Sequence, residues 1–319
     1  MQPWIARQDT PRRNLLRPVA LLAALAAALL ALAGCHPGNA EARTLIAACD
    51  GGDAAACNQL AGRLQKGQHV LRDEERAAAL FGRACEGGVG DGCASLGRLH
   101  ERGTGVKRDS ARAAALFRQG CEQGGLVGCT RLGVLHRRGI AVPRDPAQAA
   151  VLFDRACDGG ELSGCAELGA LLAAGEGVAP DPRAAAELFR RSCDADVAVG
   201  CLGLARLHLA GTEVARSDSL ALALFERACD GDDAGACFEL GVLHEEGRGA
   251  PQNYQRAARL HRVACAGGHG EACFRLADLY RKGAGVYRDS VEAQSRMGQA
   301  CRAGYAPACP PPKAPGASS

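Results

Sequence analysis

Sixteen of the 17 cysteines in this 319-residue chain recur with a period of 36 residues. Each period holds two cysteines that are eight positions apart. The first cysteines are Cys49, Cys85, Cys121, Cys157, Cys193, Cys229, Cys265 and Cys301, and the second are Cys57, Cys93, Cys129, Cys165, Cys201, Cys237, Cys273 and Cys309. A fixed period between about 20 and 50 residues is typical of a repeat array. We therefore expect many small stacked units rather than one large core, and an aromatic content of only 4% agrees with thin layers.

Each period predicts two helices. After the second cysteine, Leu96 and Leu99 place an apolar stripe beside the small residue Gly97, and Gly103 then ends this first helix, as a glycine past a C-terminus does. Six residues later Asp109 can accept the free N–H groups of a second helix. That second helix carries a Leu-Phe pair and runs to the next cysteine. Each unit is therefore expected to be a helical hairpin.

The segment from Leu96 to Asp109, with Ala-x-x-Leu-Phe after it, resembles the Sel1-like repeat, a 36-residue relative of the tetratricopeptide repeat. A cysteine pair in every repeat is similar to the Helicobacter cysteine-rich protein family, a β-lactamase-like subgroup. The resemblance implies an all-α fold, a right-handed α/α superhelical solenoid with a concave binding face. It covers about seven repeats plus terminal half-repeats, so we assign residues 45–309 to a single solenoid and 310–319 to a Pro-rich disordered tail.

The N-terminus predicts export. Arg12, Arg13 and Arg17 precede an apolar run over 19–33, which is shorter than the roughly 20 residues that span a bilayer. The run ends in a sequence that resembles the bacterial lipobox, which implies cleavage after residue 34 and lipidation of Cys35. We expect a signal peptide at 1–34, a short tether at 35–44 and a periplasmic or cell-surface lipoprotein. His36 follows Cys35, and by analogy with lipoprotein sorting an outer-membrane anchor is favoured. An ordinary cleaved signal peptide is the alternative.

The sixteen periodic cysteines are expected to form disulfides within each pair, closing nine-residue loops. Sequence alone does not fix the connectivity of sixteen cysteines, but an exported protein meets an oxidising compartment. The alternative is metal ligation, which is less favoured because zinc motifs use shorter spacings and four converging ligands. We therefore predict no metal and no cofactor.

Four histidines share one column, seven positions after a second cysteine: His100, His136, His208 and His244. The same column holds leucine and tyrosine in other repeats, so packing is favoured over a catalytic or ligand role. His69, His261 and His269 are isolated and carry no signal in this pattern.

The charge distribution excludes one class of partner. The formal net charge of +3 lies within the first 34 residues, so the remaining chain is neutral, and no basic cluster favours nucleic acid. By helical geometry, positions 1, 2, 5, 8 and 9 after each second cysteine point away from the leucine stripe. Charge on this surface grades from basic to acidic, and the candidate binding residues are Arg98, Arg102, Arg131, Arg137, Arg138, Glu239, Glu245 and Glu246. A merely solvated surface is the alternative interpretation.

No catalytic motif stands in the sequence, and the catalytic residues are unknown. We predict a lipid-anchored extracytoplasmic repeat scaffold that binds a protein, peptide or cell-wall fragment through the concave face. The alternative is a penicillin-binding, β-lactamase-like hydrolase, which the family resemblance implies and no residue shows. The partners expected are a protein or peptide, a peptidoglycan fragment or a β-lactam, and the membrane through the lipid anchor.

Overall fold

The computed structural model describes residues 37–309. The predicted signal peptide, the lipidation residue Cys35 and the tail 310–319 lie outside the described residues. The described chain is helical, and it divides into two compact units. Unit one contains residues 37–89 and 104–106, and unit two contains 90–103 and 107–309.

Unit one consists of α2 (Pro37–Asp50), α3 (Ala54–Lys66) and α4 (Glu74–Glu86). Helix α3 packs against both α2 and α4. Its first turn is capped by Asp53, whose side chain accepts hydrogen bonds from the N–H groups of Ala55 and Ala56. The terminal half-repeat expected before the first full hairpin is therefore α2, held to α3 by the disulfide between Cys49 and Cys57.

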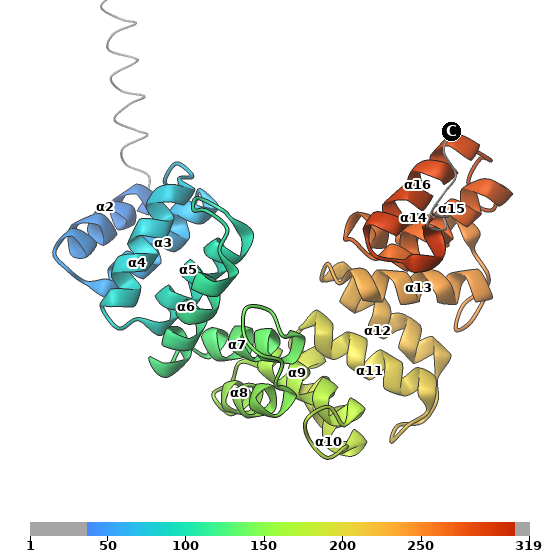
Figure 1. Cartoon of the computed structure of the whole chain (residues 1–319), viewed down its shortest axis with the longest axis horizontal. Helices are drawn as coiled ribbons and strands as arrows, with labels where there is room; N and C mark the ends of the chain where they lie inside the picture. Colours follow the sequence, from blue (N-terminus) through green and yellow to red (C-terminus); the bar gives the residue numbers. More distant parts are fainter. Residues whose placement is uncertain (1–36, 310–319) are drawn as a thin grey trace, which may run out of the picture. The chain divides into compact units, whose positions relative to one another are not determined.

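Unit two is a series of helical hairpins in which each first helix packs against the second helix that follows it. The first helices are α5 (Gly90–Arg102), α7 (Leu126–Arg138), α9 (Leu162–Ala174), α11 (Ala198–Ala210), α13 (Ala234–Glu246) and α15 (Gly270–Lys282). The second helices are α6 (Ser110–Glu122), α8 (Pro146–Asp158), α10 (Pro182–Asp194), α12 (Asp218–Asp230), α14 (Tyr254–Ala266) and α16 (Ser290–Arg302). Figure 1 shows α11, α12 and α13 side by side in this arrangement. We number the hairpins in chain order, so that α3–α4 is repeat one and α15–α16 is repeat seven.

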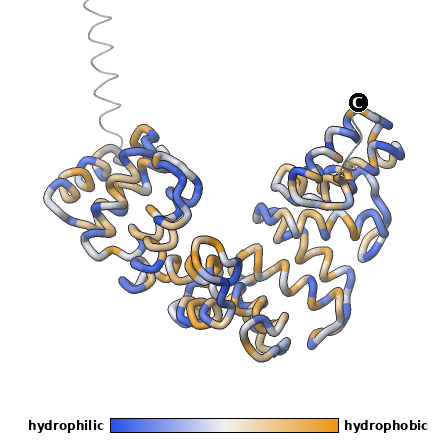
Figure 2. The backbone as a smooth tube through the Cα atoms, viewed as in Figure 1, coloured by the Kyte–Doolittle hydropathy of each residue, from blue (hydrophilic) through white to orange (hydrophobic). Residues whose placement is uncertain are grey.

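The helix ends follow the sequence signals. Each second helix begins after a polar residue whose side chain accepts a backbone N–H, as when Asp145 accepts from Gln148. The first helices end at glycines in the left-handed region, for example Gly139 with φ of 68°. In that region glycine avoids the steric cost that other residues meet. Figure 2 shows hydrophobic residues recurring along these helices between more hydrophilic turns.

In repeats two, three and four, the core is a phenylalanine of the second helix set against a glycine of the first. Phe153 is fully buried, and a Cβ built on Gly133 would lie 2.6 Å from its ring. The same pairing joins Phe117 to Gly97. The column is glycine in these three repeats because the phenylalanine ring occupies the space that a Cβ would need.

Disulfides join the second helix of one repeat to the first helix of the next. The pairs Cys121–Cys129 and Cys157–Cys165 have Cα atoms 4.6 and 4.5 Å apart. Further pairs of the same spacing are Cys193–Cys201, Cys229–Cys237, Cys265–Cys273 and Cys301–Cys309. Cys85 and Cys93 are also disulfide-bonded. The predicted fold class, an all-α, disulfide-stapled solenoid of 36-residue hairpins, is confirmed.

The array ends differently from its middle. After α16 a single 3-10 turn, η1 (Ala306–Ala308), leads to Cys309. Within α16 only Ala300 is buried, because no following hairpin covers its outer side among the described residues. This is the atypical terminal repeat that a solenoid needs.

Candidate functional site

The candidate site is the exposed surface of the first helices of unit two. We call the residues 2, 5, 8 and 9 positions after each second cysteine in α5 to α15 the A face. Helices α5, α7, α9 and α11 pack directly against one another in sequence, so the A face is continuous across them. Position 1, also expected on this surface, is buried in repeats two, three and four, where Ala94, Thr130 and Ala166 are 1%, 6% and 0% exposed. Ala94, for example, belongs to the core formed with Phe117 of α6. In repeat five, Leu202 at this position is partly exposed.

Three guanidinium groups gather at the N-terminal end of the A face. Arg98 and Arg102 come from α5 and Arg131 from α7. Burial lowers the pKa of Arg98, and the positive charges of Arg131 and Arg102 lower it further. Two carboxylates act on this cluster: that of Glu101, which lies 3.9 Å from Arg131, and that of Asp91, whose charge also acts on Arg98. This cluster therefore carries excess positive charge that a bound anion would neutralise.

Arg137 and Arg138 at the end of α7 differ in their surroundings. Arg137 donates to Glu167 of α9 at 2.6 Å, and both side chains are half-buried. Arg138 is exposed and forms no ion pair with any residue of the described chain. Of the two, only Arg138 has its guanidinium available for a ligand.

A groove lies between α9 and α11, beside these arginines. Its volume is about 430 Å³, and its walls are mainly apolar. The lining residues include Ala170, Ala173 and Ala174 of α9, Phe189 of α10, and Val199, Leu202 and Gly203 of α11. Arg137, Arg138 and Arg206 stand at its rim with Glu167 and Asp233. The groove therefore places apolar surface beside the guanidinium of Arg138, which forms no ion pair within the described chain.

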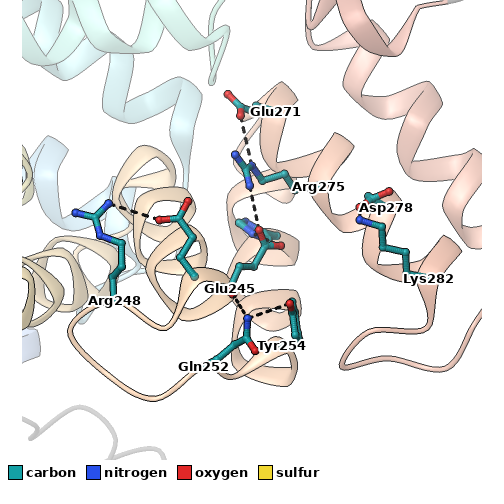
Figure 3. A network of polar contacts seen from close by, with 10 residues as sticks. Glu245, Arg248, Gln252, Tyr254, Glu271, Arg275, Asp278 and Lys282 are labelled. Atoms are coloured by element: carbon teal, nitrogen blue, oxygen red, sulfur yellow. Dashed lines mark hydrogen bonds and ion pairs between the residues drawn. The ribbon is translucent and has the colours of Figure 1, made fainter.

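The acidic residues at the other end of the A face already have partners. Glu239 accepts from Arg206 at 3.2 Å, and Glu246 lies 3.5 Å from Arg248. Glu245 accepts from Arg275 at 3.0 Å, while its other oxygen lies 3.2 Å from Nε2 of His261. Figure 3 shows this network between α13 and α15. The structure brings these glutamates to one surface, but their charge is largely neutralised by neighbouring repeats.

Glu245 is held ionised by its neighbours. Burial alone would raise its pKa, but contact with His261 and with Arg275 outweighs burial, so that the pKa is lowered. Asp278 on α15 behaves in the same way, with Lys282 and Arg281 lowering its pKa against burial. Glu245, Arg275 and Asp278 line a second cavity, of about 510 Å³. The charged side chains that line this cavity form ion pairs, Glu245 with Arg275 and Asp278 with Lys282, as expected of a network that stabilises the fold.

The sequence pattern missed His261. This side chain is fully buried and occupies the phenylalanine position of its hairpin, with Gly241 beneath its ring. His269, also missed, caps α15 by accepting from the N–H of Ala272 and stacks on Phe238 with ring centroids 4.3 Å apart. The sequence did contain a signal: His261 stands 36 residues after Phe225, in a column that holds phenylalanine in repeats one to five and Met297 in repeat seven.

The shared histidine column serves packing and turn geometry. The Nδ1 atoms of His100 and His208 lie 3.2 and 2.9 Å from the carbonyl oxygens of Lys107 and Ala215. Both contacts tie the end of a first helix to the turn seven residues later. His244 is 4% exposed, and burial lowers its pKa. Across residues 37–309 no group of three or more His, Cys, Asp or Glu side chains is placed to hold a metal ion. Helices of membrane-spanning length and apolarity do not occur in the same range.

These features define a class, a disulfide-stapled solenoid of helical hairpins with a ligand-accessible surface on its first helices. Seven consecutive segments match the Sel1 repeat, at residues 54–89, 90–125, 126–161, 162–197, 198–233, 234–269 and 270–305. The chain therefore belongs to the Sel1 repeat family. The curated proteins include no match to it.

Two solved structures share this fold. A protective antigen of uropathogenic Escherichia coli with an SLR fold is 28% identical, with a TM-score of 0.53, over 83% of this chain and 57% of the antigen. The chain thus spans little more than half the length of that relative. A Sel1 repeat protein from Oxalobacter formigenes is 17% identical with a TM-score of 0.61, over 76% of this chain and 96% of that one. Helicobacter pylori cysteine rich protein B is 25% identical, with a TM-score of 0.35, over 41% of this chain and 97% of its own.

Proposed function

We propose that this protein is an extracytoplasmic interaction scaffold whose A face binds an acidic segment of a partner protein. The observation that supports it is the excess positive charge at the start of the A face, where the three guanidinium groups of Arg98, Arg102 and Arg131 outnumber the two nearby carboxylates, Glu101 and Asp91. Arg138 extends this positive surface to the C-terminal end of α7. Guanidinium groups bind carboxylates through two parallel hydrogen bonds, which a lysine does not reproduce.

The disulfides suggest an oxidising compartment outside the cytoplasm. For the attachment of the scaffold we propose the lipidated Cys35. Cys35→Ala should move the protein from the membrane fraction to the soluble fraction while the circular dichroism of the helices stays unchanged. Membrane fractionation that is the same for both proteins would reject the anchor. The β-lactam hydrolase implied by the family resemblance is favoured by no group described between residues 37 and 309.

The binding proposal is tested with two labelled peptides of equal length, one rich in glutamate and one with every glutamate replaced by glutamine. Fluorescence anisotropy should detect binding of the acidic peptide only, and its Kd should rise with salt, since exposed charges are screened beyond about 8 Å at physiological ionic strength. The double variant Arg131→Gln and Arg138→Gln should weaken binding at least tenfold.

Two controls make the result specific. Arg118→Gln removes the same charge from an exposed position on α6, outside the A face, and should leave the Kd unchanged. Arg131→Lys keeps the charge and loses the planar fork, so it should weaken binding by less than the glutamine variant. Equal effects of Arg118→Gln and the single variant Arg131→Gln, which each remove one charge, would mean that only net charge matters, and would reject the site.

A further inference from the structure

The A face has one place where its repeating pattern of long side chains is interrupted. Positions 8 and 9 are charged in repeats two, three, six and seven, for example Arg137 and Arg138 in repeat three. Repeat four carries Ala173 and Ala174 there, and Ala170 at position 5. On the adjoining helix, position 2 of repeat five is Gly203, where the repeats on either side carry Glu167 and Glu239. The groove of about 430 Å³ is the space that these missing side chains leave.

The bottom of the groove is formed by core residues that reach the surface here. A Cβ built on Gly203 would lie 2.4 Å from the ring of Phe189, so this ring fills the space directly beside the glycine. Val199 and Leu202 continue the apolar wall along α11. Pockets that hold small ligands have volumes of roughly 300 to 1,000 Å³, so this groove of about 430 Å³ has room for an apolar side chain.

The rim determines which chemistry suits the groove. Arg137 is paired with Glu167, and Arg206 with Glu239. Arg138 is the rim cation that no described carboxylate neutralises. A ligand that presents an apolar group to the groove and a carboxylate to Arg138 would complement both surfaces.

We propose that this groove is a socket for one apolar side chain of the partner segment, with an adjacent carboxylate bound by Arg138. The proposal rests on the proposed function and names its ligand more closely: an acidic segment carrying an apolar anchor. The carboxylate comes either from an aspartate or glutamate side chain or from the C-terminus of the partner.

The experiment uses four labelled peptides of one length on the full-length protein. They carry leucine or serine at the centre, each flanked by either glutamate or glutamine. The peptide with leucine and glutamate should bind at least tenfold more tightly than the peptide with serine and glutamate. Amidated and free-acid forms of a fifth peptide, ending in leucine and lacking glutamate, separate a terminal carboxylate from a side-chain carboxylate.

The matched variants are Ala173→Gln and Ala210→Gln. Both positions are exposed on a first helix, but only Ala173 lines the groove. Glutamine at 173 fills the groove without adding charge, so it should remove the tenfold advantage of leucine and leave the serine peptide unaffected. Glutamine at 210 should change neither.

The outcomes separate the two proposals. If the glutamate peptides bind but leucine adds no affinity, or if Ala173→Gln weakens the leucine and serine peptides equally, the socket is rejected and the acidic-segment scaffold stands. If neither the glutamate peptides nor the free-acid form of the fifth peptide binds at any salt concentration, both proposals fail.

Discussion

His261 offers a direct test of how the hairpin core is built. In the other central repeats its position holds a buried phenylalanine, and here a fully buried imidazole takes that place. Nδ1 of His261 has no hydrogen-bond partner within the described chain, and Nε2 lies 3.2 Å from Glu245 at ion-pair distance, without the alignment of a hydrogen bond. Replacing His261 with phenylalanine restores the repeat pattern and removes these buried nitrogens.

The magnitude follows from two opposing contributions. A buried polar group without a partner costs about 1–3 kcal/mol, and this cost disappears in His261→Phe. The variant also loses the contact with Glu245, but that carboxylate keeps its hydrogen bond from Arg275 at 3.0 Å. We expect His261→Phe to stabilise repeat six by about 1 kcal/mol.

Phe225→His is the reciprocal control. Phe225 is fully buried, and the residue 36 positions before Glu245 is Leu209, so an imidazole at 225 would find no carboxylate at the equivalent place. The variant loses part of the transfer free energy of phenylalanine and buries two unpaired nitrogens. A loss of about 2–3 kcal/mol is expected in repeat five.

Hydrogen exchange followed by mass spectrometry is the suitable assay, because a repeat array unfolds locally and a global midpoint would dilute the effect. A gain of about 1 kcal/mol slows exchange roughly fivefold in peptides from α13, α14 and α15. Faster exchange in His261→Phe would refute the reasoning, because it would mean that the His261–Glu245 contact stabilises the repeat more than the unpaired nitrogen costs.

Three further predictions concern the hairpins and their junctions. Gly133→Ala should destabilise repeat three by about 1–3 kcal/mol, because its Cβ would lie 2.6 Å from the Phe153 ring; exchange in α7 and α8 that stays unchanged would contradict this. Reduction by a thiol should lower the thermal midpoint, since each nine-residue loop contributes about 2.5 kcal/mol in the chain-entropy model, and an unshifted midpoint after complete reduction would show that packing alone holds the junctions. Glu245 and Asp278 have lowered pKa values in the folded state, so the stability they add is present above their unfolded pKa values, near 4, and is lost as pH falls below them; Glu245→Gln should flatten that acid loss, as measured by the thermal midpoint between about pH 3 and 6.

The fold could be predicted because every repeat contains its own local signals. Asp145 as an N-cap, Gly139 as a C-cap and the Gly133–Phe153 contact all lie within one 36-residue unit. Such contacts have the same spacing in each repeat, so a column of identical residues indicates the contact. The helix bounds, the hairpin order and the disulfide staples follow from these columns.

The ion pairing of the A-face side chains could not be predicted from these columns, because the ion pairs join residues of different repeats. Arg137 with Glu167, Arg206 with Glu239, and Arg275 with Glu245 each join neighbouring first helices. Their residues stand about 30 positions apart rather than 36, so no single column contains both partners. The sequence therefore shows glutamates on the surface but not that arginines of adjacent helices already neutralise them.

The groove could not be predicted from the columns either, because it is formed by residues of two different repeats. A column analysis shows that Ala173, Ala174 and Gly203 are small, which alone would suggest a featureless surface. In the structure these positions come from adjacent helices and lie over Phe189, so that their small size opens one apolar recess beside the unpaired Arg138. In a solenoid, positions that hold the same residue in every repeat form the scaffold. Positions whose residues vary between repeats are the ones that can distinguish one ligand from another. The departure at repeats four and five is therefore the part of the A face where specificity is expected, and mutations there should alter the choice of ligand while the hairpins remain folded.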